Sequence, residues 1–167
     1  HRVSTPEETL SWIEPKLTEL GVTRLGDITA LDRTGIPVYQ AILPLSRNLS
    51  VKLGKGLTHT ASAVSAAMEA AETRCAEIID LPLTKARSAE LIRHSDATEI
   101  QSLARPNNTA DKDQTSLTWV QGINLMNAKP IWAPRDCVDM DYTRYHECSF
   151  LVRTSNGLAS GNSLAEA

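Results

Sequence analysis

The sequence lacks several features that would place it in a specialised class of proteins. It has one Phe and three Cys residues (Cys75, Cys137 and Cys148), and no CxxC pair. No apolar run approaches the roughly 20 residues that a membrane-spanning helix requires. Lys and Arg number 17 against 20 Asp and Glu, so the net charge is −3. These absences argue against a disulfide framework, a zinc site, a membrane protein and a nucleic-acid-binding protein.

A chain of 167 residues can bury one core of ordinary size. We therefore predict a single domain over residues 1–167. Without a signal peptide or an apolar anchor, the expected location is the cytoplasm. The first residue is His1, and the final "GNSLAEA" resembles the first turn of a helix. We expect both ends of the sequence to be cut from a longer protein.

The order of predicted elements indicates a mixed α/β fold. Thr5 as N-cap, Pro6 and Glu8 predict a helix that begins at residue 6, is kinked at Pro15 and ends at Gly21. A longer helix is expected over residues 60–80, one or two short helices over 88–104, and a polar loop over 104–116. Short strands broken by turns are predicted over 22–46, where 38–43 is the clearest strand. Further strands are predicted over 117–125, 129–134 and 148–153.

The helix predicted over "SAVSAAMEAAETRCAEIID" has two distinct faces. Spacings of three and four residues give a buried face, formed by Val64, Met68, Ala71, Cys75 and Ile79. A second stripe carries hydroxyls, carboxylates and a small residue, namely Ser62, Ser65, Glu69, Glu72 and Ala76. This second stripe carries no Lys or Arg.

Glu69 and Glu72 are the first candidate site residues. Carboxylates three residues apart on a helix lie close together and repel each other, unless a cation sits between them. An ExxE pair is usually part of a solvated helix face, but such faces commonly include Lys or Arg. Small neighbours also allow another element to approach closely. An oxygen-rich surface of this kind suits Mg²⁺, which bridges carboxylates to phosphates.

A glycine turn precedes the helix predicted over residues 60–80, and another precedes the C-terminal end of the sequence. "GKG", Gly54 to Gly56, allows close backbone approach to a ligand, but the P-loop pattern is absent and such a segment on its own is more often a simple turn. Gly56 stands five residues before Ala61, and Gly161 stands five residues before Glu166. This echo predicts an internal pseudo-repeat, with a second ExxE pair beyond residue 167.

Four blocks in this order, "GVTRLGDITALDRTGIPVYQAILP", "GKGLTHTASAVSAAMEAAE", "LTWVQGINL" and "SNGLASGNSLAEA", resemble the YcaO family. These ATP-dependent enzymes activate backbone amides of peptides. The resemblance is to the N-terminal portion. It implies a mixed α+β nucleotide-binding domain with an internal pseudo-repeat, truncated at its C-terminus, with the second half of the site absent from this chain.

The resemblance also implies site residues and cofactors. ATP and Mg²⁺ would bind at Arg2, Thr9, Glu69, Glu72, Asn162 and Glu166. Of these, Glu69, Glu72 and Glu166 match metal ligands, whereas no residue is implied as a catalytic acid, base or nucleophile. Ala159 departs from the pattern, because some members have a serine there that contacts ATP.

The implied reaction is O-phosphorylation of a peptide amide. External sulfide as nucleophile gives a thioamide, and a Cys, Ser or Thr side chain of the substrate gives an azoline. The section "TRLGDITALDRTGIPV" resembles stand-alone members that work with a TfuA-type partner, which favours thioamide formation on a peptide or protein. The alternatives are an azoline-forming cyclodehydratase, a non-catalytic nucleotide- or peptide-binding module, and an unrelated domain that binds phosphate through Mg²⁺. A homodimer is left open.

Other polar and aromatic residues receive simpler interpretations. His59, His94 and His146 are expected at the surface. Asp136, Asp139 and Asp141 lack calcium-loop spacing and predict an acidic loop. Trp119 and Trp132 are expected in the core.

Overall fold

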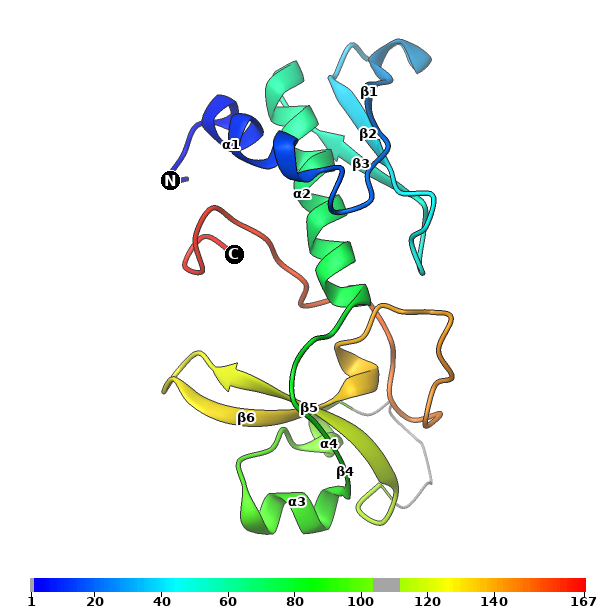
Figure 1. Cartoon of the computed structure of the whole chain (residues 1–167), viewed down its shortest axis with the longest axis vertical. Helices are drawn as coiled ribbons and strands as arrows, with labels where there is room; N and C mark the ends of the chain where they lie inside the picture. The colour runs from blue at the N-terminus through cyan, green and yellow to red at the C-terminus, as the bar shows by residue number, and fades with distance from the viewer. Residues whose placement is uncertain (1, 104–111) are drawn as a thin grey trace. The chain divides into compact units, whose positions relative to one another are not determined.

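The computed structural model describes residues 2–103 and 112–167 (Figure 1). The chain divides into two compact units, which are described separately. The first unit comprises His1–Glu77 and Asn156–Ala167, and the second comprises Ile78–Ser155. Most of the polar loop predicted at 104–116 lies outside the described residues, and the single domain over 1–167 stays a prediction.

Helix α1, Pro6–Ile13, begins as its sequence predicts. Thr5 Oγ1 accepts a hydrogen bond from Glu8 N at 3.2 Å, and Glu8 Oε2 accepts one from Thr5 N at 2.8 Å. This capping box satisfies two amides that have no partner within the helix. At Pro15 the helix gives way to the short 3-10 helix η1, Glu14–Lys16, because proline cannot donate the next helical hydrogen bond.

Three antiparallel strands in the order β1-β2-β3 form the sheet of the first unit. They are β1 Arg24–Asp27, β2 Val38–Ile42 and β3 Val51–Lys55, with the 3-10 helix η2, Thr29–Leu31, after β1. Tyr39 pairs with Gly54 and Ala41 with Lys52 in the β2–β3 register. Strand β3 was not predicted from the sequence, where "GKG" was interpreted as a turn.

Helix α2, His59–Glu77, covers one face of this sheet (Figure 1). Contact is very close at Gly54, where a Cβ would lie 2.1 Å from Ala66 N and 2.3 Å from Ser62 O. The alanines of α2 permit this approach, and Ala66, Ala67 and Ala70 are fully buried. The same core includes Ile13 of α1, Leu17 and Val22 from the segment after it, and Ala41 and Leu43 from β2 and its end.

The predicted buried face of α2 was partly wrong. Val64 is buried, but Cys75 is exposed, and Met68 and Ala71 lie at the edge of the core. The contacting face is instead the row of alanines, because α2 lies too close to β3 for larger side chains at the centre of the contact. The helix ends at Glu77 rather than at residue 80.

The second unit contains a three-stranded antiparallel sheet in the order β4-β5-β6. The elements are β4 Leu83–Arg87, α3 Ser88–His94, α4 Ile100–Leu103, β5 Ser116–Asn124, β6 Lys129–Pro134 and the 3-10 helix η3, Arg135–Cys137. Trp119 is fully buried, as expected, with Ile100, Leu117, Phe150 and Leu151 in the same core. The indole Nε1 of Trp119 donates a hydrogen bond to Ala86 O at 3.0 Å.

The mixed α/β fold class is confirmed, with two three-stranded sheets among the described residues. The predicted strand at 148–153 is wrong: Phe150 and Leu151 are buried, but their backbone is irregular. Strand β4 was missed, because its charged residues at Lys85 and Arg87 obscured the pattern. In the part of the chain that the structure describes, no helix combines the length and apolar character needed to cross a membrane.

Candidate functional site

Four of the predicted site residues lie together in the first unit, where α1 meets the C-terminal segment. Thr9 is buried in α1, and its Oγ1 lies within hydrogen-bond distance of two acceptors, Asn162 Oδ1 at 2.9 Å and Thr5 O at 3.0 Å, which share its single proton. The Thr9–Asn162 bond spans 153 residues of sequence. It attaches the Gly161 turn to the first helix.

Glu166 extends this group. Its Oε2 accepts hydrogen bonds from Asn162 N at 2.9 Å and from Asn162 Nδ2 at 3.0 Å. These bonds are the main reason that the pKa of Glu166 lies below its usual value, and the Arg2 guanidinium, with Nε 3.9 Å from Oε1, contributes less. Oε1 itself is buried and has no hydrogen-bond partner among the described residues. A buried carboxylate oxygen without a donor is an open ligand position for a cation.

The glycine turns at Gly56 and Gly161 share their local geometry. A Cβ on Gly56 would lie 2.8 Å from the Cβ of Ala61, five residues on. A Cβ on Gly161 would lie 3.0 Å from the Cβ of Glu166, also five residues on. Both positions therefore need glycine because the following turn folds back against them.

The hydrogen bonds of the two turns match as well. Ser62 N donates to Thr58 O at 3.0 Å, and Ala167 N donates to Ser163 O at 3.1 Å. In each turn the accepting carbonyl lies two residues after the glycine, and the donating amide lies six residues after it. The similarity between the two segments that the sequence indicated is therefore supported for the two glycine turns.

Glu69 and Glu72 both lie on α2. Glu69 is exposed and Glu72 half-buried, and neither forms an ion pair or hydrogen bond with another described residue. Their predicted stripe is not uniform, because Ser62 is buried and donates to Gly54 O at 2.8 Å, and Ala76 is buried too. Both carboxylates thus remain accessible to solvent on the surface of α2.

A cation does face this pair, from a neighbouring strand. Lys52 of β3 is only 5% exposed and lies on the side of the sheet that α2 covers. Burial lowers the pKa of Lys52, an effect opposed by the carboxylates of Glu69, Glu77 and Glu72 in that order. Partial loss of contact with solvent raises the pKa of Glu69. The positive charge of Lys52 opposes this rise, whereas the negative charge of Glu72 adds to it.

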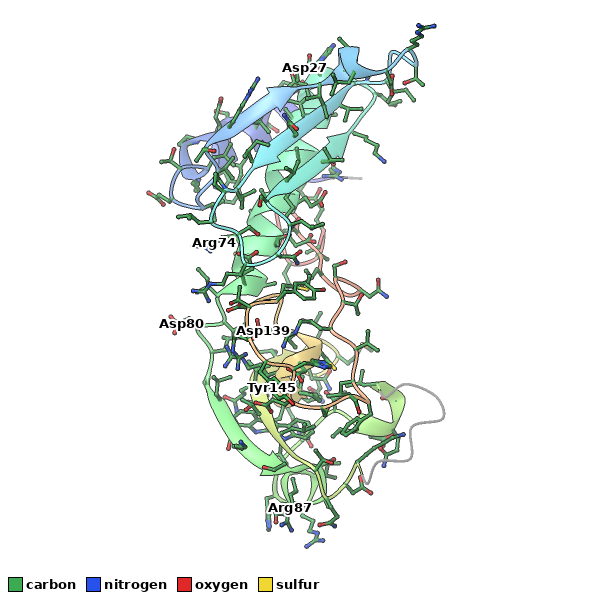
Figure 2. The ribbon with its side chains drawn as sticks, turned by 90° about the vertical axis from the view of Figure 1, so that its right-hand side faces the viewer. Asp27, Arg74, Asp80, Arg87, Asp139 and Tyr145 are labelled. Atoms are coloured by element: carbon green, nitrogen blue, oxygen red, sulfur yellow. The ribbon has the colours of Figure 1, made fainter. Side chains whose placement is uncertain are left out.

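Glu77, the third carboxylate near Lys52, is already engaged. It is 2% exposed and accepts a short hydrogen bond from Ser46 Oγ. Arg74 Nη1 lies 3.4 Å from its Oε2, and Figure 2 marks Arg74 on this part of α2. Glu77 therefore closes the C-terminal end of the helix against the β2–β3 connection.

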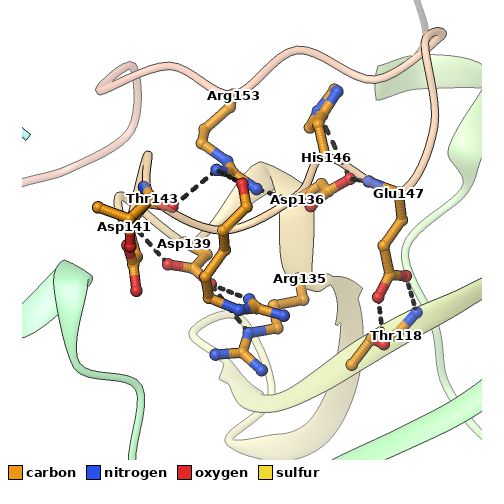
Figure 3. A network of polar contacts seen from close by, with 10 residues as sticks. Thr118, Arg135, Asp136, Asp139, Asp141, Thr143, His146, Glu147 and Arg153 are labelled. Atoms are coloured by element: carbon orange, nitrogen blue, oxygen red, sulfur yellow. Dashed lines mark hydrogen bonds and ion pairs between the residues drawn. The ribbon is translucent and has the colours of Figure 1, made fainter. Parts of the chain in front are cut away.

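The second unit holds its own buried charges (Figure 3). Asp139 Oδ2 pairs with Arg135 Nε at 2.9 Å and also with Arg144, and Asp136 Oδ1 pairs with Arg153 Nη2 at 3.0 Å. Asp136 and Asp139 of the predicted acidic loop are therefore buried and paired with arginines, which is how buried carboxylates avoid a large desolvation cost. Asp141 is buried too, and its carboxylate accepts a hydrogen bond from Thr143 N at 3.0 Å.

A cavity of about 560 Å³ lies beside the end of β1 in the first unit. Its lining includes Asp27, Asp32, Arg33 and His59, and none of the predicted site residues. Asp27 accepts from Thr29 N at 2.8 Å and faces His59 Nδ1 at 3.2 Å, while Asp32 accepts from Thr34 N at 2.8 Å. Both carboxylates thus serve local turns, and His59 lies at the surface as predicted.

The predicted site residues fall into two groups within the first unit. One is Arg2, Thr9, Asn162 and Glu166; the other is Glu69 and Glu72 with Lys52. Among the described residues, no hydrogen bond or ion pair joins the two groups. No three His, Cys, Asp or Glu side chains of the described chain converge as a metal site. Glu166 Oε1, which accepts no hydrogen bond, and the unpaired carboxylates of Glu69 and Glu72 nevertheless fit Mg²⁺, which prefers carboxylate oxygens.

Residues 53–167 match the family model described as YcaO cyclodehydratase, ATP- and Mg²⁺-binding. The chain belongs to the YcaO family. The family expected from the sequence is thus confirmed, and ATP and Mg²⁺ are confirmed as the ligands in the family's description.

Curated relatives match nearly the whole chain. A protein of the tfuA 3′ region of Rhizobium leguminosarum bv. trifolii is 38% identical over 170 residues, covering 99% of this chain and 39% of the relative. A protein of Methanothermobacter thermautotrophicus is 38% identical over 168 residues, covering 97% of this chain and 42% of the relative. This YcaO chain therefore spans about two fifths of the length of these relatives.

Solved structures agree on the fold. YcaO from Methanopyrus kandleri, bound with AMPPCP and Mg²⁺, is 25% identical with a TM-score of 0.71, over 99% of this chain and 40% of that one. A heterocyclase in complex with substrate and cofactor is 22% identical with a TM-score of 0.74, over 98% of this chain and 26% of that one. The described units therefore have a YcaO fold.

The sequence alone missed Lys52. It appeared as an ordinary charged residue before "GKG", because β3 was not predicted and its burial was therefore hidden. The alternation in "VKLGK", with Lys52 and Gly54 on one face, was the available signal. Recognising that strand would have placed the lysine opposite the glutamate helix.

Proposed function

We propose that the protein containing this chain uses ATP and Mg²⁺ to phosphorylate the oxygen of a peptide backbone amide, and that sulfide then yields a thioamide. The observation that carries the proposal is the buried Oε1 of Glu166, which accepts no hydrogen bond from a described residue and has Arg2 Nε 3.9 Å away, beside Thr9 and Asn162 at a glycine turn. Such a group can hold a metal ion next to phosphate.

The chain's own residues would divide the binding work. Glu69, Glu72 and Glu166 offer carboxylate oxygens to Mg²⁺, and Arg2 offers a guanidinium to phosphate oxygens. Thr9 and Asn162, held by their mutual hydrogen bond, would orient the nucleotide against α1. When bound, ATP and Mg²⁺ supply a phosphoryl group whose transfer converts the amide oxygen into a leaving group.

Thioamide formation is favoured by the relative from the tfuA 3′ region. This relative supports a TfuA-like partner protein that assists the reaction on a peptide or protein substrate. The fold alone fits either product, because a heterocyclase shares it. An azoline would require a Cys, Ser or Thr of the substrate to attack the neighbouring carbonyl.

The test is to incubate the full-length protein with its partner, a candidate peptide, Mg²⁺-ATP and sulfide, and to weigh the product. Exchange of one oxygen for one sulfur, with release of ADP and phosphate, is the expected result. Loss of one water without sulfur uptake would identify azoline formation instead. Intact peptide with no ATP consumption would contradict the proposal.

The first prediction concerns Glu72→Gln in the full-length protein. Loss of one carboxylate ligand should lower ATP turnover by at least about 100-fold, while the melting temperature stays unchanged or rises slightly as the repulsion with Glu69 is removed. Phosphate release and thermal unfolding measure the two effects. Glu19→Gln, which changes an exposed carboxylate after α1, is the control and should alter neither. Wild-type turnover in Glu72→Gln would refute the metal assignment.

A further inference from the structure

We propose that Lys52 is a positioning residue whose buried charge makes Mg²⁺ binding at Glu69 and Glu72 conditional on the nucleotide. The inference extends the proposed function, on which it rests. Lys52 would weaken binding of the free metal ion and strengthen binding of the metal together with the anionic triphosphate.

The geometry of β3 and α2 directs Lys52 to this place. Alternate residues of a strand share a face, so Lys52 and Gly54 both face α2. Gly54 contacts the helix at Ser62 and Ala66. Strand β3 and helix α2 run in opposite directions. A residue that precedes Gly54 on the strand therefore faces helix residues that follow Ala66. Lys52 therefore faces the turns that carry Glu69 and Glu72, the carboxylates that act on it electrostatically.

Burial makes this lysine unusual. Lys is almost never buried unless it is paired, yet Lys52 is 5% exposed and forms no ion pair with a described residue. Removing an ammonium group from water destabilises the fold, and carboxylates acting through space offset only part of that cost. Because Met or Leu would fill the same space without this cost, the charge calls for a functional explanation.

The charge balance supplies one. Glu77 is engaged by Ser46 and Arg74, so the carboxylates open to a ligand are Glu69 and Glu72. With Lys52, this part of the site carries one net negative charge instead of two. Compared with the same site without Lys52, this site attracts a bare Mg²⁺ less strongly. Once Mg²⁺ is bound, the site with Lys52 is more positive and attracts the anionic triphosphate more strongly. Metal and nucleotide thus bind together rather than in sequence.

The experiment measures two affinities in full-length protein carrying Lys52→Met. Free Mg²⁺ should bind about tenfold more tightly, seen as a lower metal concentration for half of the Mg²⁺-induced rise in melting temperature. AMPPCP, measured by calorimetry at saturating Mg²⁺, should bind about tenfold more weakly. Lys52→Arg, which keeps the charge, should preserve both affinities.

Lys55→Met is the matched comparison, because Lys55 is exposed, lies on the opposite face of the same strand and acts on Glu69 less strongly than Lys52 does. Both affinities should shift clearly less in Lys55→Met than in Lys52→Met. If Lys52→Met shifts both affinities in the same direction, or neither, with an unchanged melting temperature in chelator, the inference is overturned. If wild-type protein binds no Mg²⁺-AMPPCP at all, the proposed function fails, and this inference fails with it.

Discussion

At the scale of single residues, Gly54 shows how strongly the contact between β3 and α2 depends on the absence of a side chain. The atoms that a Cβ would meet, Ala66 N and Ser62 O, belong to the backbone of the helix. No rotamer change can move them aside. Because Lys52 depends on the same contact for its position, Gly54 affects both the core and the site.

Gly54→Ala should therefore destabilise the protein by at least about 3 kcal/mol, since the helix must move away from the sheet. Chemical denaturation followed by circular dichroism measures the change. Gly122→Ala in β5 is the control, because a Cβ there meets no atom within 4 Å. That control should be neutral or stabilising by less than about 1 kcal/mol. Equal stability of the two variants would contradict the close-contact argument.

The sequence predicted some of these residue positions and not others. Glu69 and Glu72 followed from helical spacing, because both partners lie on one element. The Thr9–Asn162 bond joins residues 153 apart, so no local pattern could reveal it, and only the family resemblance placed both residues in one site. Lys52 depends on which face of a strand is covered, which a single short strand does not specify.

At the scale of elements, Glu147 attaches the loop after β6 to Thr118, near the start of β5 (Figure 3). Its two carboxylate oxygens accept from Thr118 N and Thr118 Oγ1, both at 2.6 Å. Desolvation raises the pKa of Glu147, but these two hydrogen bonds, together with the nearby charges of Lys85 and Arg144, outweigh that effect and hold the pKa below its ordinary value of 4.5. The ionised form is therefore the one that the folded protein favours.

Because the pKa is lower in the folded protein, this stabilisation is fully present above the ordinary pKa of 4.5 and is lost as the pH falls through the folded value. Glu147→Gln should show a shallower loss of stability between about pH 5 and pH 3 than the wild type. The difference should be about 1 kcal/mol or less, since Glu147 is half-exposed. Melting temperatures across that pH range measure it. Glu99→Gln, an exposed control, should follow the wild-type curve.

Elements were predicted best where capping or length gave a strong signal. Thr5, Pro6 and Glu8 defined the start of α1, and the length of the alanine-rich run identified α2. At 148–153 the apolar side chains of Phe150 and Leu151 are buried without strand pairing. The flanking side chains hold this irregular segment in place, because Glu147 accepts from Thr118 N and Arg153 donates to Asp141 O. Short edge strands such as β3 and β4 gave too little alternation to be recognised.

At the scale of the whole molecule, the second unit is one continuous stretch, Ile78–Ser155, whereas the first is assembled from two. The second unit has its own core around Trp119 and its own buried ion pairs. Both features are those of an independently folding domain.

We therefore predict that residues 78–155, produced alone, fold cooperatively. Trp119 should be shielded from solvent, which gives blue-shifted fluorescence that reverts in a single transition on adding urea. Asp139→Asn should lower the midpoint of that transition, because it removes the negative charge that faces Arg135 and Arg144. A random-coil circular dichroism spectrum for the fragment would contradict the prediction.

The divided first unit has a consequence for biosynthesis. A ribosome adds about 5 to 20 residues per second, so roughly 8 to 30 s separate the emergence of Thr9 from that of Asn162. Throughout that time α1 and the sheet can pack, but the turn that carries Glu166 does not yet exist. The group that we propose to bind the nucleotide is thus completed only after the whole second unit has been translated. A nascent chain whose synthesis stops within the second unit would have α2 and its glutamates, but would lack Asn162 and Glu166, through which we propose that ATP is bound.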